Sequence, residues 1–566
     1  MSLQPEYCNV TKLFVERLFR IPDYQRAYSW GTKQRKDLFD DITRLSACKN
    51  TADHFMASVV CLKREPIELE TSTYTLYDIV DGQQRITSLI ILLKVLSEEL
   101  KKSKDASLKA RGQEIEGMLI KDDGRLVLLQ GNHDSSLMFQ SFLKSYKKPS
   151  PDHIKTQAEK NICNAINETE KFVTAWGKLS ELLKIVLSRL CFVYYAIEDE
   201  GAVYSTFEVL NSRGLTVDWL DKTKSSIMGI IYEKHHSEVS RELFSECNKI
   251  WSDIYQTIGT NNISGDEILR FSATLKTDGE ISKMLSAEEA LFFFKTYCME
   301  NPDRILDAQL FIRDIAVKLK ALYENTRLNA VTDIIHARLL YIAIQSSDHI
   351  APKDKTVLLN LWERVTFRIF GIAKKDSRTM NGKYIQIARK IFNNIDLSIA
   401  EISEDLKNIG NDFNIQKVFE SLLSEKDCYN GWSHELRYFF FRYEEYLAKK
   451  SGADLDASEW AQIWASHPET SIEHIFPQNP DASWIGKMGK GNGVIANNVH
   501  RLGNLVLLPA KKNNDASNGA FQEKKKIYRK SNILILKEIF TKHNWTIDQI
   551  KEREKSLMDF AVETWG

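Results

Sequence analysis

The stretch that decides the fold of the N-terminal part runs from residue 75 to residue 100 and reads TLYDIVDGQQRITSLIILLKVLSEEL. Its first six residues, Thr75 to Val80, are mostly β-branched, aromatic or aliphatic and predict a strand. Asp81 and Gly82 form a turn dipeptide, and apolar residues recur at helical spacing from Ile86 to Leu100. The stretch therefore predicts a strand, a tight turn and a helix.

The pattern of amino acids changes twice along the rest of the chain. The first hundred residues alternate short β-like runs with turns, whereas apolar residues recur at the helical period through residues 161–190, 287–299 and 308–323. From roughly residue 465 onward Pro, Gly and Asn become frequent and strand-like pieces return. A chain of 566 residues exceeds one hydrophobic core. We expect an α+β, multidomain protein: an α/β domain over 1–105, a helical extension and connector over 106–349, and a C-terminal helical region over 350–566 whose core spans about 465–535.

Composition excludes several classes of protein. Lys plus Arg equals Asp plus Glu at 77 each, so any affinity for nucleic acid must come from local basic patches. The eight cysteines are scattered without a CxxC pair, which favours reduced thiols over a disulfide frame or a zinc site. The longest apolar run, Leu89 to Leu93, is too short for a membrane span. These features predict a cytoplasmic protein with no membrane partner.

One ordered series of motifs near the C-terminus has the residues for phosphodiester hydrolysis. Residues 471–478 read SIEHIFPQ, residues 501–508 read RLGNLVLL, and two lysines and two asparagines follow at 511–514. Hydrolysis needs an activated water, a cation and rigid placement of both. A carboxylate such as Glu473 can hold Mg²⁺, and a neutral imidazole such as His474 can take a proton. Neighbouring strand residues point to opposite sides, so the two can share a site only where the strand ends or bends, as Pro477 suggests.

A second candidate site lies at the strand-to-helix turn. Free backbone N–H groups at a helix start favour an anion, Gly82 lets a ligand approach the backbone, and Arg85 can fork onto a phosphate. Asp81 can cap the helix or hold a cation. Upstream, residues 21–30 read IPDYQRAYSW, and Tyr24, Gln25 and Arg26 suit stacking on a base and holding a phosphate. The alternatives are an ordinary turn at residues 81–82 and a packing patch at residues 26–30.

The C-terminal motifs resemble the HNH nuclease motif of the DUF1524 family, which occurs in GmrSD-type modification-dependent restriction enzymes and related phage-defence proteins. The resemblance implies a ββα-metal core with His474 as general base, Glu473 and Asn513 as metal ligands, and Asn504 bracing the loop that holds the base. The family's Phe-x-x-Lys element matches Phe521 and Lys524, so the resemblance makes Lys524 a candidate phosphate contact. The third motif position is asparagine instead of histidine, which favours Mg²⁺ or Mn²⁺ over zinc.

The N-terminal motifs IPxYQRxYxW and DGQQR resemble the DUF262 family, whose fold is similar to ParB and sulfiredoxin and whose usual partner is the DUF1524 nuclease. The resemblance extends through residues 207–215 and 220–224. It implies binding or hydrolysis of a nucleoside triphosphate (GTP, UTP, CTP or ATP) and sensing of modified DNA. The ligand residues it implies add Gln83, Gln84, Asn211, Arg213 and Lys224 to those named above.

These features predict a metal-dependent DNA endonuclease of a phage-defence or modification-dependent restriction system, with the N-terminal site regulating cleavage. The partners expected are double-stranded DNA, modified or phage-derived, and a nucleoside triphosphate. The alternatives are a nickase that responds to phosphorothioate-modified DNA and a nucleotide-regulated DNA-binding protein with an inactive HNH site. The presence of Glu473, His474, Asn504 and Asn513 together favours an enzyme. The oligomeric state, including a homo-oligomer, stays open.

Overall fold

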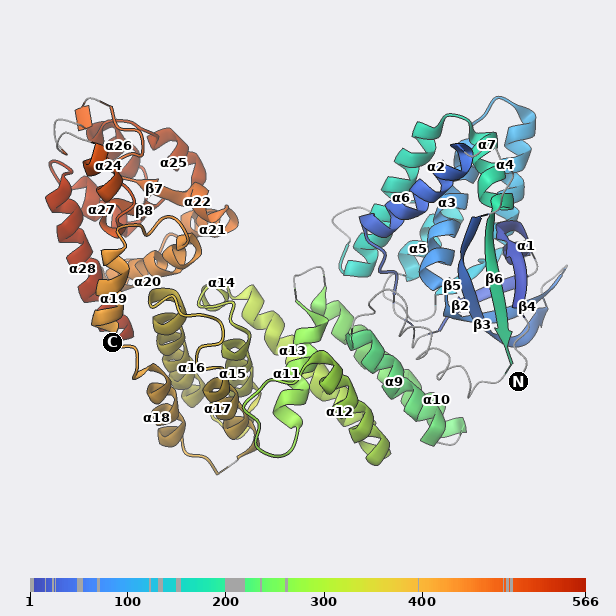
Figure 1. Cartoon of the computed structure of the whole chain (residues 1–566), viewed down its shortest axis with the longest axis horizontal. Helices are drawn as coiled ribbons and strands as arrows, with labels where there is room; N and C mark the ends of the chain where they lie inside the picture. Colours follow the sequence, from blue (N-terminus) through green and yellow to red (C-terminus); the bar gives the residue numbers. More distant parts are fainter. Residues whose placement is uncertain are drawn as a thin grey trace. The chain divides into compact units, whose positions relative to one another are not determined.

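The computed structural model describes residues 5–15, 17–22, 25, 27–47, 54–68, 72–121, 124–130, 136–148, 154–198, 219–234, 237–259, 263–394, 396–481, 483–484, 488 and 492–566. The chain divides into two compact units, one made of residues 1–273 and 285–317, the other of residues 274–284 and 318–566 (Figure 1). The multidomain α+β class expected from the sequence is confirmed. Each unit is described by itself.

The first unit is built on a mixed sheet of six strands in the order β1-β6-β3-β4-β2-β5. Strand β4 pairs in parallel with β2 and antiparallel with β3, so the segment before the glycine turn lies inside the sheet. The strand predicted at residues 75–80 is confirmed as part of β4. The strand bounds are β1 Pro5–Asn9, β2 Arg17–Ile21, β3 His54–Glu68, β4 Thr73–Asp81, β5 Leu128–Gln130 and β6 Leu190–Ile197.

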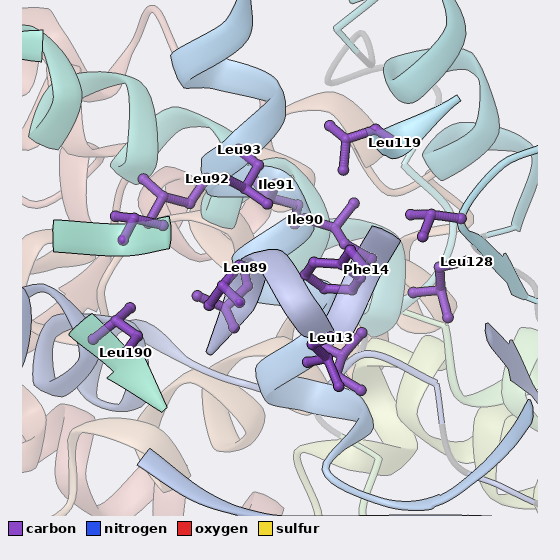
Figure 2. Close-up of a cluster of buried hydrophobic side chains, with 14 of the residues drawn as sticks. Leu13, Phe14, Leu89, Ile90, Ile91, Leu92, Leu93, Leu119, Leu128 and Leu190 are labelled. Carbon is purple, nitrogen blue, oxygen red and sulfur yellow. The ribbon is translucent and has the colours of Figure 1, made fainter. Parts of the chain in front are cut away.

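Helix α3 (Gln83–Lys101) is the core helix of this unit, and its prediction from residues 86–100 is confirmed. Every residue from Ile86 to Ser97 is buried, so the helix is covered all round. Figure 2 shows Leu89 to Leu93 among apolar side chains contributed by α1, α4, β5 and β6. The one charged residue in this stretch, Lys94, pairs with Glu98 at 2.8 Å and with Glu116 at 3.1 Å. The apolar run too short for a membrane is thus the centre of a domain core.

The expected border at residue 105 lies inside the first unit. Strands β5 and β6, which complete the sheet, come from residues 128–130 and 190–197. The sequence pattern missed β6 because a continuous apolar run of eight residues shows neither the alternation of a half-buried strand nor a helical period. The helices of this unit are α1 Val10–Val15, α2 Thr32–Ala47, α4 Ala106–Leu119, α5 Ser136–Ser145, α6 Gln157–Trp176, α7 Leu179–Lys184, α9 Trp219–Lys234, α10 Ser237–Ile258, α11 Gly265–Lys276, α12 Ala287–Glu300 and α13 Ile305–Glu324, of which α11 and α13 run across the division between the units.

Several helices begin where the sequence carries a capping box. In α6 and α12 the side chains of Thr156 and Ser286 accept from backbone N–H groups three residues later, and a glutamate there returns the bond. These two helices, with α13, confirm the helical prediction for most of residues 161–190 and for 287–299 and 308–323. None of the described helices combines the length and apolar composition needed to cross a membrane.

The second unit is helical except for a pair of short antiparallel strands, β7 (Ile472–His474) and β8 (Leu505–Leu507). Both strand-like runs predicted near the C-terminus are therefore confirmed. The expected border at residue 349 lies within this unit, directly after α15. Its helices are α14 Thr326–Asn329, α15 Ile335–Ser346, α16 Pro352–Thr366, α17 Asn381–Asn393, α18 Ile399–Gly410, α19 Ile415–Ser424, α20 Ser433–Ser451, α21 Ala457–Ala465, α22 Pro468–Ser471, α24 Asn492–Asn498, α25 Ala510–Ala516, α26 Phe521–Tyr528, α27 Leu534–Phe540 and α28 Ile547–Trp565.

Candidate active site

Four predicted site residues lie in one strand, strand, helix unit at the C-terminal end of the chain (Figure 1). Glu473 and His474 are the last residues of β7, Asn504 directly precedes β8, and Asn513 lies on α25. The strands pair Glu473 with Val506 and His474 with Leu505. The short sheet therefore brings the three sequence motifs together.

Glu473 is buried and faces helix α26. Its Oε1 accepts hydrogen bonds from Lys524 Nζ at 2.8 Å and from Tyr528 Oη at 2.6 Å. The Lys524 side chain is fully buried, and Nζ also donates to the carbonyl oxygen of His474 at 2.6 Å. Burial raises the pKa of Glu473 and lowers that of Lys524. In this structure the Lys524 ammonium group therefore bonds residues of β7 and does not face outward, as a contact to a DNA phosphate would require.

His474 contacts a different set of groups. Its Nε2 lies 3.0 Å from Nδ1 of His500, and the ring of Tyr429 meets it edge-on at 4.7 Å. Glu473 and His474 therefore follow the alternation of strand side chains and do not converge on one point. Burial, with the charges of His500 and Lys524, lowers the pKa of His474 to about 3. The ring is neutral at physiological pH, the form in which one nitrogen can accept a proton.

Asn504 holds the chain around the histidine. Its Oδ1 accepts from the backbone N–H of Phe476 at 2.8 Å and from Nε1 of Trp545 at 3.1 Å. Its Nδ2 donates to the carbonyl oxygens of Phe476 at 2.9 Å and Val499 at 2.8 Å. The side chain is fully buried, and its bonds to Phe476 and Val499 join the residues after β7 to those before β8. This is the contact pattern of a residue that braces the loop after His474.

Asn513 and the glycine before Asn504 fix the two ends of the unit. Asn513 Nδ2 donates to the carbonyl oxygens of Thr470 at 2.8 Å and Ile472 at 3.2 Å, so α25 is pinned to the start of β7. A Cβ at Gly503 would lie 2.1 Å from the carbonyl oxygen of Ile550, so only glycine lets α28 pack this closely.

Three contributors to this site were missed from the sequence. His500 lies four residues before Asn504, and that spacing within the same motif was a signal that could have found it. Tyr528 follows Lys524 by four residues, which places both on one helix face. Trp545 is separated from Asn504 by about forty residues, and no local pattern indicates its contact.

The N-terminal turn has the backbone geometry expected of it. Gly82 has a φ of 100°, and a Cβ there would lie 3.1 Å from Cγ2 of Val59. A left-handed residue pressed against the neighbouring strand requires glycine. Helix α3 begins at the next residue, so its first N–H groups lie directly after the turn.

The two N-terminal motifs form one packed structure. Gln84 Oε1 accepts from the backbone N–H of Ser29 at 2.7 Å and of Trp30 at 3.3 Å, and its Nε2 donates to Ala27 O at 3.1 Å. Gln25 Nε2 donates to Val80 O at 2.8 Å. Both glutamines are buried, as are Tyr28 and Trp30. The contacts of Tyr28 and Trp30 are those of the packing alternative weighed from the sequence, whereas Gln25 and Gln84, predicted as ligand residues, use their amides inside the fold.

Asp81 and Arg85 differ from the glutamines because both are partly exposed. Within the described part of the chain, Arg85 makes no side-chain hydrogen bond or ion pair. Gln83 is buried at the same turn. Lys224 is buried on α9, with Nζ 5.5 Å from the ring centroid of Tyr255. Four further residues predicted to bind the ligand lie outside the described residues: Tyr24, Arg26, Asn211 and Arg213.

Comparison with protein-family models gives two matches. Residues 10–228 match the N-terminal domain of GmrSD restriction endonuclease, and residues 413–560 match the C-terminal domain of GmrSD restriction endonucleases. The chain belongs to the GmrSD restriction endonuclease family. The N-terminal GmrSD match contains both N-terminal motifs, and the C-terminal GmrSD match contains the whole cluster around His474. Nuclease activity of the restriction type, with DNA as the substrate, follows from membership. No curated protein matches the chain.

The metal expected from the resemblance of the GmrSD C-terminal domain to HNH nucleases can be tested against the donor atoms present. Both side-chain bonds of Asn513 use Nδ2, so they do not involve the oxygen that a cation needs. The bonds of Glu473 to Lys524 and Tyr528 both fall on Oε1. An amide oxygen and a carboxylate oxygen are donors that a hard cation takes, but in this structure Glu473 and the proposed base lie on opposite sides of β7. Among the described residues no cluster of three or more His, Cys, Asp or Glu side chains is arranged for a metal.

Proposed function

We propose that the C-terminal unit is an HNH-type, metal-dependent DNA endonuclease and that the partly exposed turn at the start of α3 regulates it by binding phosphate. The observation that carries the proposal is a buried histidine at the end of β7, held in a strand, strand, helix frame by the four hydrogen bonds of Asn504. Rigid placement of a base in its acceptor form is what hydrolysis of a phosphodiester requires.

In the proposed reaction His474 takes a proton from a water molecule. The water oxygen forms a bond to phosphorus, and the bond from phosphorus to the leaving oxygen breaks. A bound Mg²⁺ or Mn²⁺, for which Asn513 Oδ1 and Glu473 Oε2 are the proposed ligands, would supply positive charge for the transition state once Glu473 turns from α26 to the side of His474. Asn504 keeps the histidine loop in place, and Lys524 with Tyr528 orients Glu473.

The N-terminal part of the proposal rests on Arg85 and the helix start. A partly exposed guanidinium that bonds no described side chain, next to the N–H groups of a helix N-terminus, is suited to a phosphate of a nucleoside triphosphate or of DNA. In this proposal the domain is ParB/sulfiredoxin-like and acts as the sensor for modified or phage-derived DNA in the cytoplasm. Asp81 and Gly82 line the same turn.

The nuclease proposal is tested with the full chain on supercoiled plasmids carrying unmodified, glucosylated or phosphorothioated DNA. Each plasmid is incubated with Mg²⁺ or Mn²⁺, with and without each of GTP, UTP, CTP and ATP. Linear product supports a restriction nuclease, and open-circular product alone supports the nickase alternative. A protein that binds these plasmids and cuts none of them would contradict the proposal in favour of an inactive HNH site.

The regulatory part is tested by substituting Arg85→Ala, with Arg111→Ala as a matched control. Arg111 lies on α4 of the same unit and pairs with Glu114 at the surface. A charge-assisted bond to phosphate contributes about 1.5–3 kcal/mol, so the dissociation constant of the bound nucleotide should rise roughly 10- to 100-fold in the Arg85 variant only. Equal affinities of both variants for all four nucleotides in equilibrium dialysis would reduce the turn to a structural cap.

A further inference from the structure

His500 is the nearest ring to the proposed base. It lies between α24 and the turn that carries Asn504, and its Nδ1 is 3.0 Å from Nε2 of His474. The two rings stand at 71° with centroids 5.1 Å apart, so the contact is a hydrogen bond between ring nitrogens and not a stack. One of the two nitrogens must carry the proton and the other must accept.

The proposed reaction requires one of the two arrangements. The side-chain amide nitrogen of Gln478 is nearly equidistant from the two ring nitrogens of His474, 3.3 Å from Nδ1 and 3.5 Å from Nε2, so it favours neither. Nε2 is engaged by His500, so a His474 that acts as the base must take the proton at Nδ1, where the lone pair must then lie. The proton of neutral His474 is then on Nε2 and is donated to His500 Nδ1. Gln478 itself is exposed, so its side chain can leave Nδ1 when substrate arrives.

His500 is itself held on two sides. The ring of Tyr429 stacks on it with centroids 5.1 Å apart and 9° between the planes, and the same tyrosine meets His474 edge-on at 4.7 Å. The carbonyl oxygen of His500 accepts from the backbone N–H of Cys428 at 2.8 Å. The segment before α20 therefore clamps the ring that contacts the base.

We propose that His500 is a positioning residue of the nuclease reaction: by accepting the Nε2 proton of His474 it holds that ring in the tautomer whose Nδ1 lone pair takes the proton from water. This inference rests on the proposed function. In the proton transfer His474 gains a proton on Nδ1 and keeps the one on Nε2, so the resulting imidazolium still donates to His500, which stays neutral.

The test uses the full chain with His500→Leu, His500→Asn, Gln478→Leu and, as a matched control, His543→Leu at an exposed position. Asparagine can place an acceptor oxygen where Nδ1 of histidine lies, whereas leucine cannot. Under single-turnover conditions with Mn²⁺ and supercoiled plasmid, His500→Leu should lower the cleavage rate by about 10²-fold, the lower end for loss of a positioned base. His500→Asn should recover most of the rate, and the KM for plasmid should change less than about twofold in both.

A second readout does not depend on cleavage. The ¹⁵N chemical shifts of labelled histidines distinguish protonated from unprotonated ring nitrogens, and His474→Ala assigns its signals. We expect an unprotonated Nδ1 in wild type and Gln478→Leu, and a mixture of tautomers in His500→Leu. A protonated Nδ1 in wild type, or an unchanged rate and tautomer in His500→Leu, would overturn this inference but not the proposed function. A wild type that cuts no plasmid would overturn the proposed function and, with it, the role of His500.

Discussion

Replacing Lys524 by methionine should loosen β7 and β8 far more than its position on a charged helix suggests. The Lys524 side chain is fully buried, and that of its partner Glu473 is 4% exposed. Methionine keeps most of the volume but removes the positive charge and the bonds to Glu473 and His474 O. Removing one partner of a buried ion pair costs about 3–5 kcal/mol because the other charge is left without compensation.

This magnitude converts into a rate of hydrogen exchange. Amides in the short sheet exchange through local opening, and each 1.4 kcal/mol of lost local stability speeds exchange about tenfold. Exchange of the segments at residues 472–476 and 505–508 should therefore accelerate roughly 100- to 5,000-fold. Because burial already raises the pKa of Glu473, its neutral form is the one the variant tolerates. The variant's loss should therefore grow as pH rises through that pKa and shrink at low pH.

Hydrogen–deuterium exchange mass spectrometry of the full chain measures the effect. Lys526→Met is the matched control, since Lys526 lies on the same helix and forms an exposed pair with Glu523. An exposed pair contributes at most about 1 kcal/mol, so the control should leave both segments near the wild-type rate. If Lys524→Met exchanges no faster than Lys526→Met, the ion pair does not hold β7 and the account of this cluster fails.

Three further variants test other contacts. Gly503→Ala should lower the free energy of unfolding by roughly 1–3 kcal/mol or more, and with it the thermal midpoint, because the added Cβ would lie 2.1 Å from Ile550 O. Gly493→Ala, whose Cβ would have nothing within 4 Å, should be neutral or stabilising. Equal midpoints for the two variants would refute the close packing. Asn504→Asp puts an oxygen where Nδ2 donates to two carbonyl oxygens. Loss of these two buried bonds should lower the local stability by roughly 3 kcal/mol and so speed up hydrogen exchange of residues 472–476. Unchanged exchange would mean that Asn504 is not needed to hold this segment. Burial lowers the pKa of His336 to about 4, so as the pH falls the unfolded chain is protonated at this residue before the folded chain is. The free energy of unfolding should therefore fall by about 2 kcal/mol between pH 7 and pH 5. Thermal melts of His336→Phe should lose that pH dependence.

The elements that local pattern specifies were predictable, and those that depend on tertiary contacts were not. The turn at Gly82 combines a strand run, a left-handed glycine and a helical period within one window, so β4 and α3 followed from sequence. Strand β6 did not, because eight apolar residues following a helix give no period that separates strand from helix. The border predicted at residue 105 falls before the last two strands of this sheet along the chain.

The candidate site likewise has a part that local sequence patterns predict and a part that depends on tertiary contacts. The order of the motifs predicted that β7, β8 and α25 meet, and the alternation of strand side chains already warned that Glu473 and His474 point apart. What the sequence could not supply was the set of partners from distant segments. Tyr528 and Trp545 reach Glu473 and Asn504 across 55 and 41 residues. The resemblance to the DUF262 family made Gln84 a candidate ligand residue, yet its amide bonds residues 27–30 inside the fold.

The central claim, that the cluster around His474 cuts DNA with a bound divalent cation, is tested most directly by one cleavage assay. Wild type, His474→Ala and the matched control His543→Ala are incubated as full chains with Mn²⁺ and the plasmid that wild type cuts best, and each reaction is repeated in EDTA. Loss of the base should slow the His474 variant by at least about 10²-fold while DNA binding is kept, with His543→Ala at the wild-type rate and no cutting by any protein in EDTA. A His474→Ala variant that cuts as fast as wild type, or full activity after chelation, would contradict the account.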